Sequence, residues 1–250
     1  MTFDFADTRV VVAGGSRGIG RSIALAFAQA GASVSICARG AEALAAADAE
    51  IGRHARTHHA AVCNLADGEA IARYVPEAAA ALGGIDVLIN NASGFGAGDS
   101  DAGWDASTSV DIMATVRASR AAVPFLERAR AGAIVNISSI SGFRPSVRAP
   151  AYAAAKAAVI NYTTSQAAAL AGKRIRVNCV APGSIEFPGG VWDQRRRANP
   201  DLYARTLGSI PFGRMGAPEE VANVVLFLAS PLAGWVTGQA IAVDGGQLLS

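Results

Sequence analysis

The chain has 250 residues, of which 51% are apolar and 17% are charged, and its formal net charge is +2. Because the basic residues are scattered apart from Arg195, Arg196 and Arg197, the composition excludes the concentrated basic surface of a nucleic-acid-binding protein, and we interpret this triplet as a solvated helix face. No apolar run reaches the roughly twenty residues that span a bilayer, and an acidic start unlike a signal peptide predicts a cytoplasmic protein without a membrane partner.

The predicted elements alternate between short β-branched runs and longer alanine-rich segments. The predicted strands are 9–13, 32–37, 59–63, 85–90, 133–138 and 174–181, and the predicted helices are 18–30, 41–53, 67–82, 104–129 and 150–171. This alternation predicts βαβ units, that is, an α/β fold with a parallel sheet and helices on both faces. No linker divides the series, so we predict a single doubly wound Rossmann-fold domain over residues 1–250.

Residues 184–216 form the longest stretch without a strand pattern, and they are rich in proline and glycine. Loops of that length in a compact domain are usually functional. We therefore predict that this segment is a substrate loop or lid.

The cysteines are three in number and far apart, each in or beside an apolar run: Cys37, Cys63 and Cys179. This pattern favours buried reduced thiols over a disulfide framework, and a reducing compartment. The three histidines lie in one stretch, where His54 and His58 form a possible metal pair. No acidic or cysteine partner accompanies them at ligand spacing, so we favour a solvated helix end and expect no metal site.

A glycine-rich turn, GGSRGIG at 14–20, lies between the first predicted strand and the first predicted helix. Glycines let the backbone bend sharply and approach a ligand closely, while the helix N-terminus attracts a pyrophosphate. The spacing is not GxGxxG, and the absence of a following GK[ST] excludes a P-loop. The turn indicates a dinucleotide site.

Two arginines favour NADP over NAD as the cofactor. An NAD site would carry an acidic residue at the end of the second strand, where this chain has Arg39 and no acid before Glu42. Together with Arg17 in the glycine turn, Arg39 would suit a ribose 2′-phosphate through charge-assisted contacts. The alternative is two loop arginines that face solvent, and NAD then remains possible.

A tyrosine and a lysine stand four residues apart in the alanine-rich run PAYAAAKAAV at 150–159. This spacing places Tyr152 and Lys156 on the same face of a helix, where both can act on one point. The alternative for the pair alone is an amphipathic contact at the edge of the core, with the ammonium extending to water.

These features together resemble the short-chain dehydrogenase/reductase (SDR) family over nearly the whole chain, and 3-oxoacyl-ACP reductase-like members in particular. The matching motifs are the glycine turn (Gly14, Gly18, Gly20), NNASG at 90–94, Ser139 in SISG, the YxxxK pair, Pro182-Gly183, and VTGQAIAVDGG at 236–246. The resemblance implies a parallel seven-stranded sheet and a homotetramer that pairs its helices across two-fold axes.

The resemblance also implies residue roles. Tyr152 would be the general acid-base catalyst, Ser139 would hold the substrate oxygen, and Lys156 would bind the nicotinamide ribose and stabilise the tyrosinate electrostatically. The implied cofactor contacts are Gly14, Ser16, Arg17, Gly18, Ile19, Gly20, Arg39, Asn64, Leu65, Asn91, Ala92, Ser93, Tyr152, Lys156, Pro182, Gly183 and Ile185.

Four positions depart from the family pattern. Ala13 stands where a threonine usually braces the glycine turn, and Asp111 stands where the catalytic tetrad has asparagine. Phe187 replaces a threonine that contacts the cofactor amide. Asn64 replaces aspartate, although an amide can still meet adenine. We expect Asp111 to remain a catalytic-site residue, because the asparagine acts through its main-chain carbonyl.

The predicted function is hydride transfer between NADP(H) and a carbonyl or secondary alcohol substrate, such as a medium-sized ketone or a 3-oxoacyl thioester. One alternative is a cofactor-binding sensor or scaffold that has lost catalysis, because fold does not fix function. Another keeps the family but changes the reaction to an epimerase or dehydratase step. The helix 150–171 has Lys156 as its only formal charge, which predicts burial by a second subunit.

Overall fold

The structure is a computed structural model, and it describes residues 3–250. Seven parallel strands form one sheet in the order β3-β2-β1-β4-β5-β6-β7. The strands are β1 (Arg9–Ala13), β2 (Ser33–Ala38), β3 (His58–Val62), β4 (Val87–Asn90), β5 (Ala133–Ile137), β6 (Arg176–Pro182) and β7 (Ala240–Val243). The predicted doubly wound Rossmann-type fold is therefore confirmed.

The main helices are α1 (Gly18–Gln29), α2 (Ala41–Ile51), α3 (Gly68–Leu82), α4 (Asp101–Ala106), α5 (Thr115–Leu126), α6 (Pro150–Leu170), α7 (Val191–Ala198), α8 (Pro200–Gly208) and α9 (Pro218–Ala229). A π-helical segment, η1 (Ser107–Ala114), connects α4 to α5. Short 3₁₀ turns are η2 (Ile140–Gly142), η3 (Ala171–Lys173) and η4 (Pro231–Ala233).

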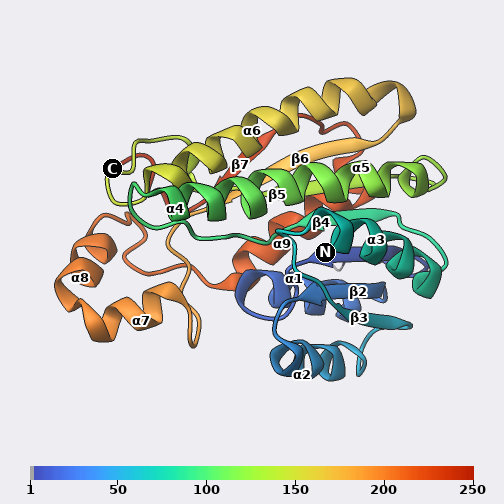
Figure 1. Cartoon of the computed structure of the whole chain (residues 1–250), viewed down its shortest axis with the longest axis horizontal. Helices are drawn as coiled ribbons and strands as arrows, with labels where there is room; N and C mark the ends of the chain where they lie inside the picture. Colours follow the sequence, from blue (N-terminus) through green and yellow to red (C-terminus); the bar gives the residue numbers. More distant parts are fainter. Residues whose placement is uncertain (1–2) are drawn as a thin grey trace.

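The sheet lies between two helical layers (Figure 1). Successive side chains of β1 point to opposite faces, so Val10 and Val12 pack with α1, α2 and α9, whereas Val11 and Ala13 pack with α3, α5 and α6. All four residues are buried. Burial on both faces explains why the strands read as continuous apolar runs.

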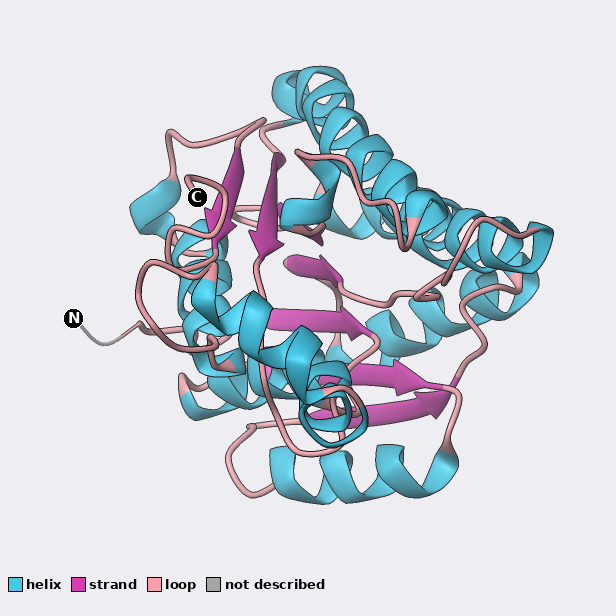
Figure 2. Ribbon diagram, turned by 90° about the vertical axis from the view of Figure 1, so that its left-hand side faces the viewer, coloured by secondary structure: helices cyan, strands magenta, loops and turns pink. Residues whose placement is uncertain are grey.

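The chain reverses its winding direction between β1 and β4, the central neighbours in the sheet. In open parallel sheets, ligands bind beyond the carboxyl ends of the strands at this point. Figure 2 looks at the molecule from that end, and Figure 1 shows α7 and α8 at the same end.

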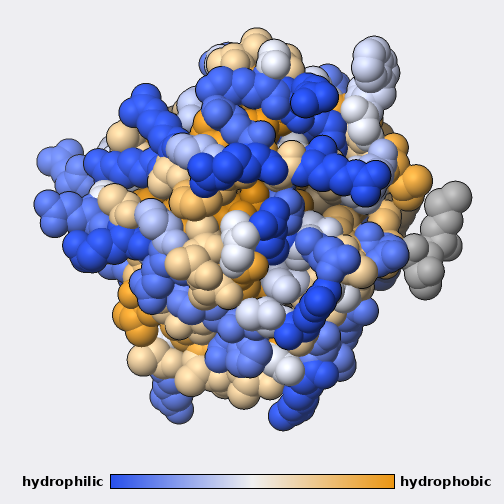
Figure 3. Space-filling model, turned by 90° about the vertical axis from the view of Figure 1, so that its right-hand side faces the viewer, coloured by the Kyte–Doolittle hydropathy of each residue, from blue (hydrophilic) through white to orange (hydrophobic). Residues whose placement is uncertain are grey.

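The opposite end of the sheet is closed by polar contacts. Asp86, just before β4, accepts hydrogen bonds from the Arg9 backbone N–H and guanidinium at 2.7 to 2.8 Å. Gly83 ends α3 at this end of the sheet with a positive φ of 79°, whereas Asp67 caps the start of α3, at the carboxyl end of β3, by accepting from the Glu69 N–H. Figure 3 shows hydrophilic side chains over much of this end.

The structure revises three local predictions. The predicted helix 104–129 is divided into α4, η1 and α5, because the chain forms a π-helical stretch around residue 111. The segment 184–216 contains the helices α7 and α8. His58 belongs to β3 and not to a helix end, and it contacts Asp48 at 2.7 Å.

Candidate active site

The glycine turn forms a compact cradle at the start of α1. Gly14 and Gly18 have φ values of 89° and 53°, which side-chain-bearing residues rarely adopt. The N–H groups of Gly14 and Gly15 donate to the Cys37 carbonyl at 3.1 Å, which fixes the turn on β2. The cradle therefore presents the N-terminus of α1, as pyrophosphate binding requires.

Gly20 has no space for a side chain. A Cβ there would collide with the Gly14 carbonyl oxygen and with the Asn91 amide nitrogen, which donates to that same oxygen at 2.8 Å. Gly20, Gly14 and Asn91 thus form one tightly packed unit. Asn91 brings the segment after β4, including Ala92 and Ser93, against the turn.

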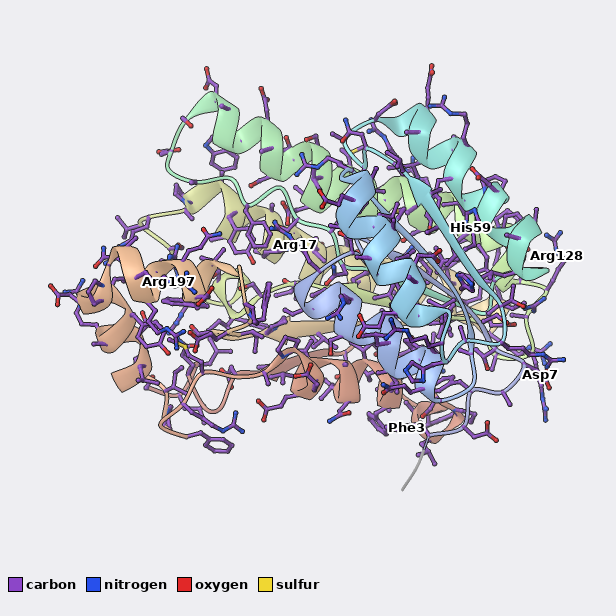
Figure 4. The ribbon with its side chains drawn as sticks, turned by 90° about the horizontal axis from the view of Figure 1, so that it is seen from below. Phe3, Asp7, Arg17, His59, Arg128 and Arg197 are labelled. Carbon is purple, nitrogen blue, oxygen red and sulfur yellow. The ribbon has the colours of Figure 1, made fainter. Side chains whose placement is uncertain are left out.

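Most residues predicted to bind the adenosine part of the cofactor follow β2 and β3. Arg17 and Arg39 are both exposed, and Arg17 immediately precedes α1. Asn64 uses its side-chain oxygen to accept from the Ala66 N–H at 3.2 Å, which leaves its amide nitrogen free to donate. Leu65 is buried beside this segment. In Figure 4, Arg17 lies toward the end of the molecule that carries α7, whereas His59 lies toward the other end.

The segment after β6 reaches the same cradle. Gly183 donates to the Val243 carbonyl at 2.9 Å, and Ile185 pairs with Gly216 in a parallel bridge. Phe187 lies against Gly18, where its ring fills the space that a side chain at position 18 would need. The aromatic ring that replaces the expected threonine thus contacts the glycine turn itself.

Helix α6 is tied to the sheet by a buried polar chain. Asn90 donates to Asn136 at 2.8 Å, Asn136 donates to Thr163 at 3.0 Å, and Thr163 donates to the Val159 carbonyl at 2.8 Å. These residues belong to β4, β5 and α6. This buried chain of hydrogen bonds links β4 and β5 to the helix that carries Tyr152 and Lys156 and so positions that helix.

Tyr152 and Lys156 lie on one face of α6, as predicted. The Lys156 ammonium lies 5.5 Å from the centre of the Tyr152 ring. Lys156 is 2% exposed, so it does not extend to water as an edge-of-core lysine would. Phe95 stacks on Tyr152 with ring centroids 5.9 Å apart. This contact could not be predicted from sequence spacing, although Phe95 lies in the segment that follows NNASG.

Lys156 is held by two elements besides its own helix. Its ammonium donates to the Ile137 carbonyl at 3.0 Å and lies 2.9 Å from Asp111 Oδ1, a contact made through charge more than through a linear hydrogen bond. Burial acts to lower the pKa of Lys156, but the charge of Asp111, followed by that of Tyr152, outweighs it, and the pKa is raised. Lys156 therefore stays charged.

The two serines at the end of β5 have different environments. Ser138 donates to the Lys156 carbonyl at 2.7 Å and is buried, so it supports the helix. The Ser139 hydroxyl oxygen accepts from the Ser141 N–H at 3.1 Å and begins the η2 turn. Sequence reasoning did not identify the supporting contacts of Ser138 and of the Ile137 carbonyl, because no motif marks them.

Helices α7 and α8 are linked to the segment after β6. Tyr203 donates to Glu186 at 2.9 Å, and Arg196 lies 3.6 Å from the same carboxylate. Asp193 accepts from the Gly189 N–H at 2.9 Å and pairs with Arg197. Arg196 and Arg197 of the triplet are exposed, as interpreted from the sequence, and both also pair with Asp193 while Arg196 pairs with Glu186.

All three cysteines are free and buried, as predicted. Among residues 3–250, no group of three or more metal-ligating side chains comes together. Within the same described range, no helix is long and apolar enough to cross a membrane.

Comparisons with known proteins agree with this geometry. The family model described as enoyl-(acyl carrier protein) reductase matches residues 13–247. The 3-oxoacyl-[acyl-carrier-protein] reductase of Chlamydia trachomatis is 37% identical over 242 residues, which cover 95% of this chain and 96% of that protein.

Two solved structures extend the comparison. An NADPH-bound short-chain oxidoreductase from Pseudomonas aeruginosa PAO1, described as containing an atypical catalytic centre, is 35% identical with a TM-score of 0.88, and the match covers 98% of each chain. A 7α-hydroxysteroid dehydrogenase in complex with NADH and 7-oxo glycochenodeoxycholic acid is 30% identical with a TM-score of 0.91, covering 98% of this chain and 96% of that one. Similarity along nearly the whole length, together with the sheet order and the glycine turn, shows that the chain belongs to the short-chain dehydrogenase/reductase family of oxidoreductases.

Proposed function

We propose that the protein is an NADP(H)-dependent oxidoreductase that interconverts a ketone or 3-oxoacyl-type carbonyl and the corresponding secondary alcohol. The observation that carries this proposal is the common face of Tyr152 and Lys156, at the same end of the sheet as the glycine cradle. A cofactor-binding scaffold without catalysis would not need a lysine 2% exposed beside a phenol.

The residues of the chain support a division of roles. A bound nicotinamide supplies or accepts the hydride. Tyr152 donates the proton to the substrate oxygen in reduction, and Ser139 positions that oxygen through its hydroxyl. Lys156 binds the nicotinamide ribose and influences the charge of Tyr152. The cradle fits a dinucleotide, because Gly14 and Gly18 hold the turn in positive-φ conformations at the N-terminus of α1, where a pyrophosphate binds in this kind of fold.

The preference for NADP rests on local charge. One related structure holds NADPH and another holds NADH, so family membership alone leaves the choice open. Arg17 and Arg39 flank the predicted ribose position and are exposed, and a guanidinium binds a phosphate through two parallel hydrogen bonds. A 2′-phosphate would gain this contact, whereas a 2′-hydroxyl would not.

We expect NADPH to give at least about tenfold higher kcat/KM than NADH, which corresponds to about 1.4 kcal/mol from the arginines. Steady-state reduction of a panel of ketones and 3-oxoacyl thioesters with each cofactor measures this ratio. The Arg39→Ala variant should lose most of the preference, and Arg73→Ala, an exposed arginine on α3, should keep it. Equal or better turnover with NADH would contradict NADP preference, and no turnover with any carbonyl would contradict the proposed function.

We further propose that α7 and α8 form a lid over the substrate, within one dinucleotide-binding domain that spans the chain. Apolar side chains are exposed both at the start of α7, where Val191 has an exposed fraction of 40%, and in other loops, where Phe95 and Phe143 have exposed fractions of 56% and 47%. An apolar rim suits a carbonyl substrate without a charged group next to the reacting carbon.

We also propose a homotetramer. The only formal charge on α6 is Lys156, which is buried, whereas Ala154 and Ala157 face outward beside a groove that includes Phe143. An uncharged helix face of this kind is stabilised when a second copy covers it. Light scattering at micromolar concentration should give four times the 25.4 kDa of one chain. The mass of a single chain would refute the proposal.

A further inference from the structure

The charge beside Tyr152 is compensated inside the protein. The side chains of Lys156 and Asp111 are 3% and 0% exposed, so water screens neither charge, and Nζ lies 2.9 Å from Oδ1. A buried ammonium without a partner is strongly disfavoured, whereas an opposite charge at this distance makes its burial tolerable. Lys156 and Asp111 therefore act as a neutral unit.

Further contacts fix the aspartate in this position. Asp111 Oδ2 accepts from the Gly94 N–H at 2.9 Å, and the Asp111 carbonyl accepts from the Thr115 hydroxyl at 2.8 Å. The π-helical segment that contains Asp111 packs against α6. Turning the carboxylate away would leave the Lys156 ammonium with the Ile137 carbonyl but no opposite charge, and it would leave the Gly94 N–H without its acceptor, which costs free energy.

The titratable groups that face Lys156 come from three elements. They are Asp111 on η1, Tyr152 on α6 itself and Cys179 on β6, while β5 contributes the Ile137 carbonyl. Burial raises the pKa of the Cys179 thiol to about 11, so this group stays neutral in ordinary buffers. Of the titratable groups beside Lys156, Tyr152 is therefore the one that the proposed proton transfer uses.

We propose that Asp111 is a positioning residue that cancels much of the Lys156 field at Tyr152 and so keeps the phenol protonated in alkaline solution. An uncompensated ammonium would favour the phenolate. Carbonyl reduction needs the phenol: its O–H bond breaks, an O–H bond forms on the substrate oxygen as hydride forms the C–H bond, and the phenolate regains a proton from water. Reduction should therefore persist to higher pH than an asparagine would allow. This inference rests on the proposed function.

The Asp111→Asn variant tests the inference, because asparagine keeps the shape and can still accept from Gly94. We expect the alkaline fall in kcat/KM for ketone reduction with NADPH to begin about one pH unit lower than in the wild type, since one negative charge leaves the site. Below about pH 7 the kcat/KM values of the variant and the wild type should agree within about threefold. The matched control is Asp86→Asn, which removes a carboxylate paired with Arg9 at the other end of the sheet and should leave the profile unmoved.

A second readout does not depend on turnover. The ultraviolet absorbance of tyrosinate is titrated as the difference between each protein and its Tyr152→Phe counterpart. The Tyr152 phenolate should appear at lower pH in Asp111→Asn than in the wild type. Appearance at the same or a higher pH in the folded variant overturns the proposal, as does an equal shift in Asp86→Asn.

The two readouts also separate this inference from the proposed function. If the phenolate appears earlier in the variant but neither protein reduces any ketone, the charge role of Asp111 stands and the proposed function fails. If Asp111→Asn does not fold, the same absorbance titration of the wild-type protein tests the proposal. Formation of the Tyr152 phenolate below about pH 8, well under the usual phenol pKa of about 10, would contradict it.

Discussion

Replacing Tyr152 with phenylalanine should lower kcat/KM for ketone reduction by about 10³-fold, because a positioned general acid contributes about 10² to 10⁴ to the rate. Phenylalanine removes the hydroxyl but retains the ring that stacks on Phe95 at 5.9 Å. NADPH binding and thermal stability should therefore change little. Initial rates with saturating NADPH, together with a fluorescence titration of the cofactor, separate loss of chemistry from loss of binding.

The matched control is Tyr162→Phe, since Tyr162 lies on the same helix and has no place in the proposed mechanism. Burial raises the pKa of Tyr162, so its phenol is neutral at working pH. This variant should retain wild-type rates within about twofold. If Tyr152→Phe kept more than a tenth of the wild-type rate, Tyr152 would not be the proton donor.

Replacing Gly20 with alanine should weaken NADPH binding by about 100-fold. The new Cβ would collide with the Gly14 carbonyl oxygen and the Asn91 amide nitrogen, neither of which can move without opening the glycine turn. Overpacking of this kind costs about 1 to 3 kcal/mol, and the distortion falls on the cradle that is proposed to hold the pyrophosphate. Isothermal titration with NADPH measures the loss.

Gly172→Ala is the corresponding control, because a Cβ at position 172, which follows α6, meets no atom within 4 Å. Both variants add one methyl group. If Gly20→Ala bound NADPH within about threefold of the wild type, the cofactor would not depend on the cradle. A drop in melting temperature for Gly20→Ala alone would locate the strain at the turn.

The order of strands and helices was predictable from the sequence, because strands buried on both faces must be continuously apolar and the connecting helices keep their own periodicity. The glycine turn and the common face of Tyr152 and Lys156 followed from local spacing in the same way. The division of 104–129 was not predictable, because a π-helical stretch such as η1 depends on tertiary contacts and leaves no composition signal.

The contacts that give the site its electrostatics were also beyond sequence reasoning. Asp111 and Lys156 are 45 positions apart, and only the packing of η1 against α6 brings the carboxylate to 2.9 Å from the ammonium. The sequence indicated the substitution at Asp111 but not that both charges are almost fully buried. Likewise, Phe187 was recognisable as a departure, whereas its position against Gly18 required the fold.

The most direct test of the central claim is the transfer of isotope from cofactor to product. NADPH deuterated at C4, on each face in turn, is incubated with the wild-type protein and a ketone that it turns over, and the alcohol is analysed by mass spectrometry and NMR. The account predicts that deuterium from one face appears on the carbinol carbon, with one equivalent of NADPH consumed for each alcohol formed. Oxidation of NADPH without deuterium in the alcohol, or the absence of alcohol, would contradict the assignment of a hydride-transferring carbonyl reductase.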